Sequence, residues 1–546
     1  MIRYALPLPT DCKSSRSQTR IRRVFVARPG TRWGPLVCAV LFWAGVLPPA
    51  AADDVDYEVA FSTFLGGSQW EHARDVFVDA NGNIYLVGGT KSDNFPTTSG
   101  AFQRQQDRTG QQVGSGGYCD AFVCKFDSLG QLQWSTLLGG PNYDRAYAVE
   151  VDAAGYVYVS GRSGPGFPTT AGSFQTKFRG TDNGIYGMQN GFVAKLNPDG
   201  SSVQWAAHVG VGQLCRELSI NADGEVFVAL HYTGKGDLPP SQWFANAFQP
   251  RPAGGVEIGA MKITADGTSV QWATWLGGSA DEVPNCGIRL GADQSVFLNF
   301  TTSSDDVPTT ANAHDNSYNG KQDAFIARLS PDGAKLMMGT YFGGVENEGG
   351  NSTHSMAVDI HNNAYLVTQT KGKDMPVTTG AMQSSLSGSA GDIVAAKFSP
   401  TGELLHCTYI GGSDQDGADG VYANELGEVF FTGTTASADF PTTETAFQKS
   451  KSGKNDAVVV VLAADFSELK FGSFMGGESY DDGRAGFLGG KGDLYVTGST
   501  NGSGWPVVNA YQPKFAGGGG GKELCYEGGC FAGDVVLTKL AKKPSR

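Results

Sequence analysis

The sequence predicts an all-β fold, a seven-bladed β-propeller with four antiparallel strands in each blade. A block of about 68 residues recurs seven times along the 546-residue chain. Each block carries the pattern of four short strands, and the strand missing from the last block stands before the first. A repeat of this length indicates one repeat architecture and not a row of unrelated domains.

The landmark of each block is a pair of glycines after an apolar residue. Glycine allows the backbone to turn there without obstruction by a side chain. The pairs are Gly66-Gly67, Gly139-Gly140, Gly277-Gly278, Gly343-Gly344, Gly411-Gly412 and Gly476-Gly477, and a degraded copy lies at Val209–Gly212.

The first block shows how four strands are encoded. Asn81-Gly82, between two apolar runs, is a strong hairpin signal. Pro96 interrupts the pattern, because proline cannot donate to an interior ladder. The predicted strands are Ala73–Val78, Ile84–Thr90, Asp120–Phe126 and Leu132–Leu138.

The two ends of the repeat array complement each other. The last block ends after its third strand, Asp534–Leu540, whereas Tyr57–Leu65 before the first block reads as a fourth strand. We therefore expect Tyr57–Leu65 to complete the seventh blade and close the ring. A linear solenoid is the alternative, but its terminal units would need polar caps.

The first residues differ from the rest of the chain. Arg20–Arg32 is basic, Trp33–Leu47 is apolar, and small residues follow at Ala50–Ala52. This order is typical of a secretory signal peptide with a long basic region, predicted over residues 1–52. A retained anchor is the alternative. Residues 53–546 are then one propeller domain, exported to the periplasm, the cell surface or the medium, with no membrane span in the mature chain.

The composition limits the kinds of partner that we expect the protein to bind. The formal net charge is −13, and the repeats contain no basic cluster. An acidic surface repels phosphate backbones, so we expect no nucleic-acid partner. Export permits disulfides, and Cys525 and Cys530 flank a short segment after a Gly-rich run, so a local bridge between them is predicted.

The recurring elements also resemble a known family. Phe64–Gly67, Asn81–Gly89, Phe95–Gln103 and Asp120–Phe126 follow the pattern of the bacterial SBBP repeat, named for the seven-bladed β-propeller. The resemblance covers the mature chain and implies an exported or cell-surface propeller. It implies no shared activity and transfers no catalytic residue.

One polar position repeats, four residues after the glycine pair. It is acidic in six blocks, as Glu71, Asp144, Glu282, Glu348, Asp416 and Asp481. A ring of carboxylates at the channel mouth is a weak candidate for binding Ca²⁺, since hard cations take several oxygen ligands. The favoured alternative is structural: each carboxylate accepts local N–H groups and fixes its turn.

No catalytic set is visible. The histidines show no metal spacing, although His72 and His354 fall near the inner-strand entrances and can face the channel. The aromatic residues Tyr118, Tyr186 and Trp243 in irregular loops are candidates for sugar or protein contact, with packing as the alternative. No cofactor is expected.

Three functions remain open. The favoured one is an exported, non-catalytic binding or scaffold module that meets a protein or polysaccharide at the cell surface through its loop face. The second is an enzyme with its site at the mouth of the central channel, because such mouths are concave and pre-formed. The third is a structural component of a surface or matrix.

Overall fold

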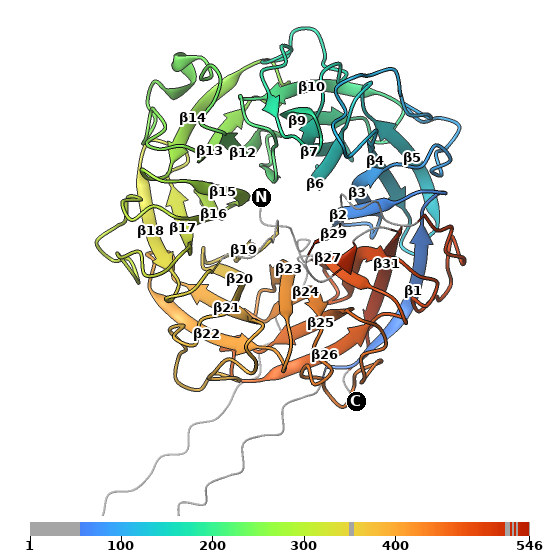
Figure 1. Ribbon diagram of the computed structural model, residues 1–546, viewed down its shortest axis with the longest axis vertical. Helices are drawn as coiled ribbons and strands as arrows, with labels where there is room; N and C mark the ends of the chain where they lie inside the picture. The colour runs from blue at the N-terminus through green and yellow to red at the C-terminus, as the bar shows by residue number, and fades with distance from the viewer. Residues whose placement is uncertain (1–54, 349–353, 519–524, 527–528, 531–532, 545–546) are drawn as a thin grey trace, which may run out of the picture.

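The computed structural model describes residues 55–348, 354–518, 525–526, 529–530 and 533–544. Within them the chain forms a ring of seven four-stranded antiparallel sheets around a central axis (Figure 1). The predicted signal peptide lies outside the described residues. Among the described residues no helix is long and apolar enough to span a bilayer.

Blades 1 to 3 follow in chain order, each from the inner strand outward. Their strands are β2 (Glu71–Val78), β3 (Ile84–Thr90), β4 (Asp120–Phe126) and β5 (Leu132–Leu138); β6 (Arg145–Val151), β7 (Val157–Ser163), β9 (Met188–Leu196) and β10 (Val203–Val209); and β11 (Leu218–Ile220), β12 (Val226–Tyr232), β13 (Glu257–Ile263) and β14 (Val270–Leu276). Blade 2 also carries the two-residue strand β8 (Thr181–Asp182), which pairs with β9. A short 3-10 helix, η1 (Ser241–Phe244), lies in blade 3.

Blades 4 to 6 repeat the plan. They consist of β15 (Glu282–Leu290), β16 (Val296–Thr302), β17 (Asp323–Leu329) and β18 (Leu336–Phe342); β19 (Met356–Val358), β20 (Ala364–Thr370), β21 (Asp392–Phe398) and β22 (Leu404–Ile410); and β23 (Asp416–Ala423), β24 (Val429–Thr435), β25 (Asp456–Leu462) and β26 (Leu469–Met475). In blade 1 all four strands that the sequence predicted are present, and the first of them, β2, is two residues longer than predicted.

Blade 7 is built from both ends of the chain. Its strands are β27 (Asp481–Leu488), β28 (Leu494–Thr500), β31 (Asp534–Lys542) and β1 (Tyr57–Leu65). β1 is the outer strand and pairs antiparallel with β31, from Tyr57 opposite Lys542 to Leu65 opposite Val535. The predicted closure of the ring is confirmed.

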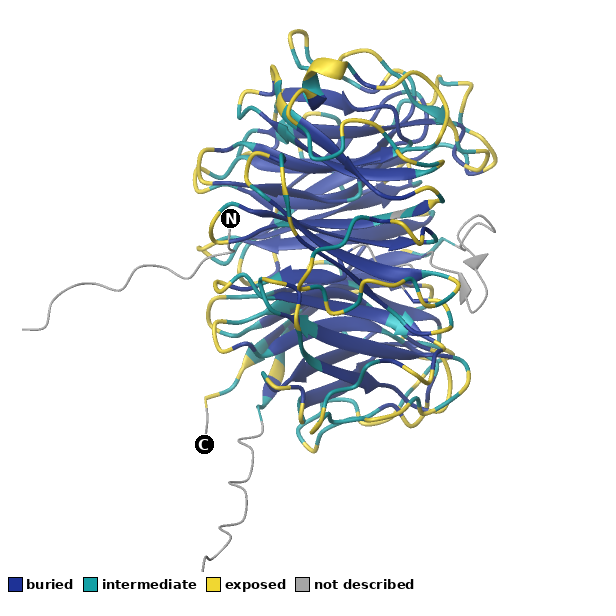
Figure 2. Ribbon diagram, turned by 90° about the vertical axis from the view of Figure 1, so that its left-hand side faces the viewer, coloured by how far each residue is buried: buried dark blue, intermediate teal, exposed yellow. Residues whose placement is uncertain are grey.

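The core lies between the faces of neighbouring blades, as the dark band across the ring in Figure 2 shows. The outer strands help to lock adjacent blades together. Trp134 on β5 donates its indole N–H to the Pro198 carbonyl in blade 2, at 3.0 Å. A Cβ at Gly200 would lie 2.6 Å from this indole, so the turn of the next blade needs a glycine there.

The short strands β29 (Cys525–Tyr526) and β30 (Gly529–Cys530) form a separate hairpin. Its register sets Cys525 directly opposite Cys530. The disulfide between them stays a prediction, which this register favours.

Candidate binding site in the central channel

The repeated acids lie at the blade junctions, where the outer strand of one blade passes into the inner strand of the next. At the first junction Gly67 donates its N–H to Glu71 Oε2 at 2.9 Å, and the Thr90 hydroxyl donates to Glu71 Oε1 at 2.6 Å. The same glycine-to-carboxylate bond recurs at Asp144, Glu282, Glu348, Asp416 and Asp481. Each acid therefore fixes its own turn.

A second carboxyl group faces the first at these junctions. Gly66 donates its N–H to Gln512, whose amide in turn donates to Asp534 at the start of β31. A Cβ at Gly66 would lie 2.6 Å from an oxygen of Asp534 and 2.6 Å from an oxygen of Glu71. Only glycine fits between the two groups. The other junction pairs are Asp120 and Asp144, Glu257 and Glu282, Asp323 and Glu348, Asp392 and Asp416, and Asp456 and Asp481.

The carboxyl groups of these pairs favour the protonated form. Burial, with Asp534 nearby, raises the pKa of Glu71 to about 8. Burial likewise raises the pKa of Asp144 to about 7 and the pKa of Asp416 and Asp481 to about 6. A cation at a junction would have to compete with such a proton. Calcium binding by the six acids stays a prediction.

One junction departs from this plan, between blades 2 and 3. Asn190 stands opposite Ser163, where Asp120 stands opposite Thr90 in blade 1. Its amide donates to the carbonyls of Val209 and Gly212 at 3.1 and 2.9 Å. This is the degraded glycine pair, and Arg216 stands four residues after Gly212 where the other blocks have an acid, so both carboxyl groups of the usual pair are missing here.

A second set of residues varies from blade to blade at a fixed place. In each blade the residue lies five positions before the first residue of the turn that follows the inner strand. We call the set of these seven residues the channel ring. Its members are Arg74, Tyr147, Arg216, Cys286, His354, Asp419 and Arg484. In blades 1, 2 and 7 this residue is the extra one of a β-bulge, which re-aims a side chain.

One side of the channel ring is neutralised by ion pairs. His354 from blade 5 contacts Glu217 from blade 3 at 2.9 Å and the Arg74 carbonyl from blade 1 at 2.8 Å. Arg289 also pairs with Glu217 at 2.6 Å. His354 therefore ties together three blades that do not follow one another in the ring.

His354, Glu217 and Asp75 also place their ligand atoms within 4.8 Å of one another, as a metal site requires. Both Asp75 oxygens, however, already accept backbone N–H groups, from Val76 at 2.8 Å and Val149 at 2.9 Å. Although burial opposes the charge, Glu217, Asp75 and Asp419 raise the pKa of His354 to about 9. The three groups fit a protonated histidine between carboxylates better than they fit a metal ion.

The other side of the ring is basic. Four guanidiniums surround the buried Tyr147 ring, with their central carbons 4.5 to 5.5 Å from its centroid; they belong to Arg74, Arg145, Arg162 and Arg216. The Tyr147 hydroxyl also accepts a short hydrogen bond from Arg145. Burial alone would raise the pKa of Tyr147, but these four charges lower it well below its usual value. We call these five residues the arginine cluster.

Aromatic side chains cover the arginine cluster. Tyr186, in the loop between β8 and β9, lies 4.4 Å from Tyr143, centroid to centroid. The guanidinium of Arg162 lies 4.6 Å from the Tyr186 ring. Of the three loop aromatics that the sequence singled out, Tyr186 thus packs against the arginine cluster. Trp243 packs beside Phe174, with a centroid distance of 6.0 Å.

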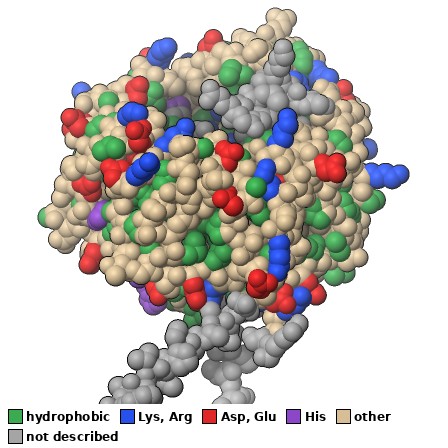
Figure 3. All heavy atoms as spheres, turned by 60° about the horizontal axis from the view of Figure 1, so that its bottom comes forward, with side chains coloured by type: hydrophobic (Ala, Val, Ile, Leu, Met, Phe, Trp, Pro, Cys, Tyr) green, Lys and Arg blue, Asp and Glu red, His purple; other side chains and the backbone are tan. Residues whose placement is uncertain are grey.

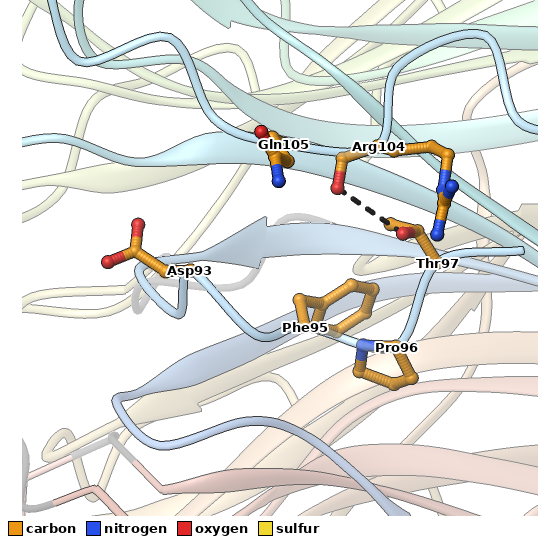
Figure 4. A pocket seen from close by; sticks show the side chains of 6 residues that line it. All are labelled: Asp93, Phe95, Pro96, Thr97, Arg104 and Gln105. Carbon is orange, nitrogen blue, oxygen red and sulfur yellow. Dashed lines mark hydrogen bonds between the residues drawn. The ribbon is translucent and has the colours of Figure 1, made fainter.

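The outer surface offers less. An open hollow of about 580 Å³ lies beside Phe95 and Pro96. The side chains that line it are drawn in Figure 4, among them Thr97, whose hydroxyl donates to the Arg104 carbonyl, and this bond is 3.3 Å long. The equivalent bond from Thr169 recurs in blade 2, so this contact belongs to the repeat. Figure 3 shows acidic and basic side chains interspersed over the face it displays. The arginine cluster is the stronger candidate.

The sequence prediction and the site overlap only in part. His72 and His354 do lie at the channel, the former 3.5 Å from Arg145. Counting from the glycine pairs missed the arginine cluster. Three of its members, Arg74, Tyr147 and Arg216, show in the sequence as variation at one register position of an otherwise regular repeat. Arg145 and Arg162 lie elsewhere on β6 and β7.

Comparisons with known proteins agree with the fold. Residues 133–168 match the family model described as the SBBP β-propeller repeat. No curated protein sequence matches the chain.

Solved structures resemble the chain only distantly. A quinohemoprotein alcohol dehydrogenase from Comamonas testosteroni shares 12% identity over 90% of this chain and 78% of its own, with a TM-score of 0.39. The polysaccharide lyase Uly1 shares 9% over 89% and 98%, with a TM-score of 0.40. BamB from Moraxella catarrhalis shares 11% over 80% and 97%, with a TM-score of 0.29. We base no functional conclusion on similarities this low. The family match and the observed ring together identify the chain as a seven-bladed β-propeller that carries the SBBP repeat.

Proposed function

We propose that this protein is an exported, non-catalytic binding propeller that recognises a protein or polysaccharide through the loop face around the channel at blades 1 to 3. The observation that supports this role is the arginine cluster, which gathers four cationic side chains in a protein of net charge −13. A positive site in an acidic molecule focuses anionic groups toward one place and repels them elsewhere.

The departure from the repeat supports the same location. In blade 2 the loop between β7 and β9 carries Tyr186, and the junction of this blade with blade 3 has lost the carboxyl pair. The two carboxyl groups that the other junctions keep are therefore absent next to the arginine cluster. Tyrosine with arginine is also the pairing enriched at binding hot spots.

Affinity gel electrophoresis tests the proposal. The mature chain is run through gels containing an anionic polysaccharide, a neutral polysaccharide or an acidic protein. We expect retardation by an anionic partner, reduced by Tyr186→Ala and unchanged by Phe102→Ala, a control at an exposed aromatic of blade 1. Equal mobility of the three proteins in every gel would contradict the role.

An enzyme at the same place is the second candidate, favoured by one observation. Tyr147, with its lowered pKa, is suited to accept a proton beside guanidiniums that neutralise a substrate's charge. Incubation with anionic polysaccharides should then shorten the polymer, and Tyr147→Phe should abolish this cleavage. An unchanged polymer with the wild-type protein would exclude this candidate for the polymers used.

A further inference from the structure

Two arginines of blade 2 face each other in the sheet. Arg145 on β6 and Arg162 on β7 are direct cross-strand partners. Like charges placed opposite each other destabilise an antiparallel pair. At the same register position of four other blades no two charges meet; the pairs are His72 and Gly89, Val283 and Thr301, Gly417 and Thr434, and Asp482 and Ser499.

Both arginines are buried, with 4% of each exposed. Arg162 keeps two nitrogens, Nε and Nη1, without a hydrogen-bond partner, and Nε is also unpartnered in Arg145 and Arg74. In the described part of the chain no carboxylate forms an ion pair with these three side chains. A buried charge without a partner is strongly destabilising, so such arginines need a compensating anion.

The polar atoms around Arg74, Arg145 and Arg162 do not supply a compensating anion for each of the three side chains. Arg145 donates to the Tyr147 hydroxyl and meets the His72 ring at 3.5 Å, and Arg162 stacks on Tyr186. Burial and the neighbouring arginines Arg162 and Arg216 lower the pKa of His231 to about 3, so this histidine adds no charge. Tyr147 stands beside Arg74, Arg145 and Arg162, and even as a phenolate it would balance one of their three charges.

Building on the binding role above, we propose that Arg74, Arg145, Arg162 and Arg216 form an oxyanion receptor, which holds a carboxylate, sulfate or phosphate group of the ligand above Tyr147. Guanidinium forks match such groups in geometry and charge. The unpartnered Nε and Nη1 of Arg162 are the donors left for it, and Tyr186 covers the site from the loop side.

The test uses simple oxyanions as probes. Thermal unfolding of the mature chain is followed in sodium chloride and, at equal ionic strength, in sodium phosphate, sulfate and acetate. We expect at least one oxyanion to raise the melting temperature in a saturable way, as a ligand of the folded state does. A response to acetate indicates a carboxylate ligand, and a response to sulfate or phosphate alone indicates a tetrahedral group.

Arg162→Gln should weaken the oxyanion response about tenfold or more, since a hydrogen bond to a charged group is lost. In chloride alone this variant should be at least as stable as the wild type, because an unpartnered charge is removed. Arg328→Gln is the matched control: Arg328 is also buried and stacked on an aromatic ring, 5.4 Å from Phe297, but lies outside the channel. It should lose stability and keep the oxyanion response.

If Arg162→Gln fails to fold, Arg162→Lys replaces it, keeping the charge without the fork; a weakened response again supports the receptor. No stabilisation by any oxyanion beyond chloride, or an equal response of the Arg162 variant, would overturn it. If oxyanions bind but no polymer or protein does, the receptor stands and the proposed function fails. If a polymer binds the wild type and Arg162→Gln equally, the proposed function stands and the receptor fails.

Discussion

The six junctions that keep a carboxyl pair and the junction between blades 2 and 3 present opposite uses of one repeat. At the regular junctions, such as that of Glu71 and Asp534, the carboxyl groups hold the turn through hydrogen bonds. At the exceptional junction Asn190 replaces an acid, and arginines and tyrosines collect beside it. We infer that the pattern serves stability where the repeat keeps it, and that its local loss marks the place proposed for recognition.

The largest effect is expected where the ring closes. Deletion of residues 57–65 removes β1, which buries Tyr57, Phe61, Phe64 and Leu65. Each large apolar side chain contributes roughly 1.5–3 kcal/mol on burial, so the loss is about 6–12 kcal/mol. Calorimetry should show a much lower melting temperature or no transition. A peptide of residues 55–66 added in trans should restore part of it and a scrambled peptide should not; an unchanged transition after deletion would show that the ring does not depend on β1.

A smaller effect is expected when a regular junction is crowded. In Gly411→Ala the new Cβ would lie 2.6 Å from Asp392 Cγ and 2.8 Å from Asp416 Oδ2. Overpacking of this kind costs about 1–3 kcal/mol. Gly100→Ala is the control, because nothing lies within 4 Å of its Cβ. Urea unfolding should separate the two variants, and equal midpoints would mean that the junction tolerates the side chain.

Imposing the regular chemistry on the exceptional junction should also cost stability. Asn190→Asp removes the amide that donates to Val209 and Gly212 and puts a carboxyl group against their carbonyls. Unsatisfied buried groups cost about 1–3 kcal/mol, so unfolding should move to lower urea, more so at alkaline pH. Asn197→Asp, in an exposed turn of the same blade, is the comparison. If Asn190→Asp is neutral, the two kinds of junction are interchangeable.

The last effect concerns the dependence of stability on pH. The pKa of Glu71 is raised to about 8 in the folded state. The stabilisation that its bound proton gives to the folded state is therefore fully present below its ordinary pKa near 4.5 and is lost as the pH rises through about 8. Unfolding free energy should therefore fall over this range. Glu71→Gln should flatten the fall, whereas Glu58→Gln, at an exposed residue of β1, should not. A fall equally steep in both variants would contradict a protonated Glu71.

The sequence predicted the ring, its seven blades and its closing strand, because the glycine pairs, the strand patterns and Tyr57–Leu65 each depend on local chemistry. It also found the junction acids. It missed the channel ring for a geometric reason. The ring residue lies seven positions after Gly67, eight after Gly278 and ten after Gly344, since bulges and insertions change the count. Neither could it predict that Arg145 and Arg162 meet, which depends on the register of β6 with β7.

The closing strand also sets an order in time. Tyr57 pairs with Lys542, so during synthesis β1 has no partner until nearly the whole chain has followed. Contacts this distant along the sequence form late, because loop closure has to precede them. Until then β1 is an open strand edge, the kind of edge that joins other chains. Correct folding of this propeller therefore depends on β1 not pairing with another chain before β31 has been made.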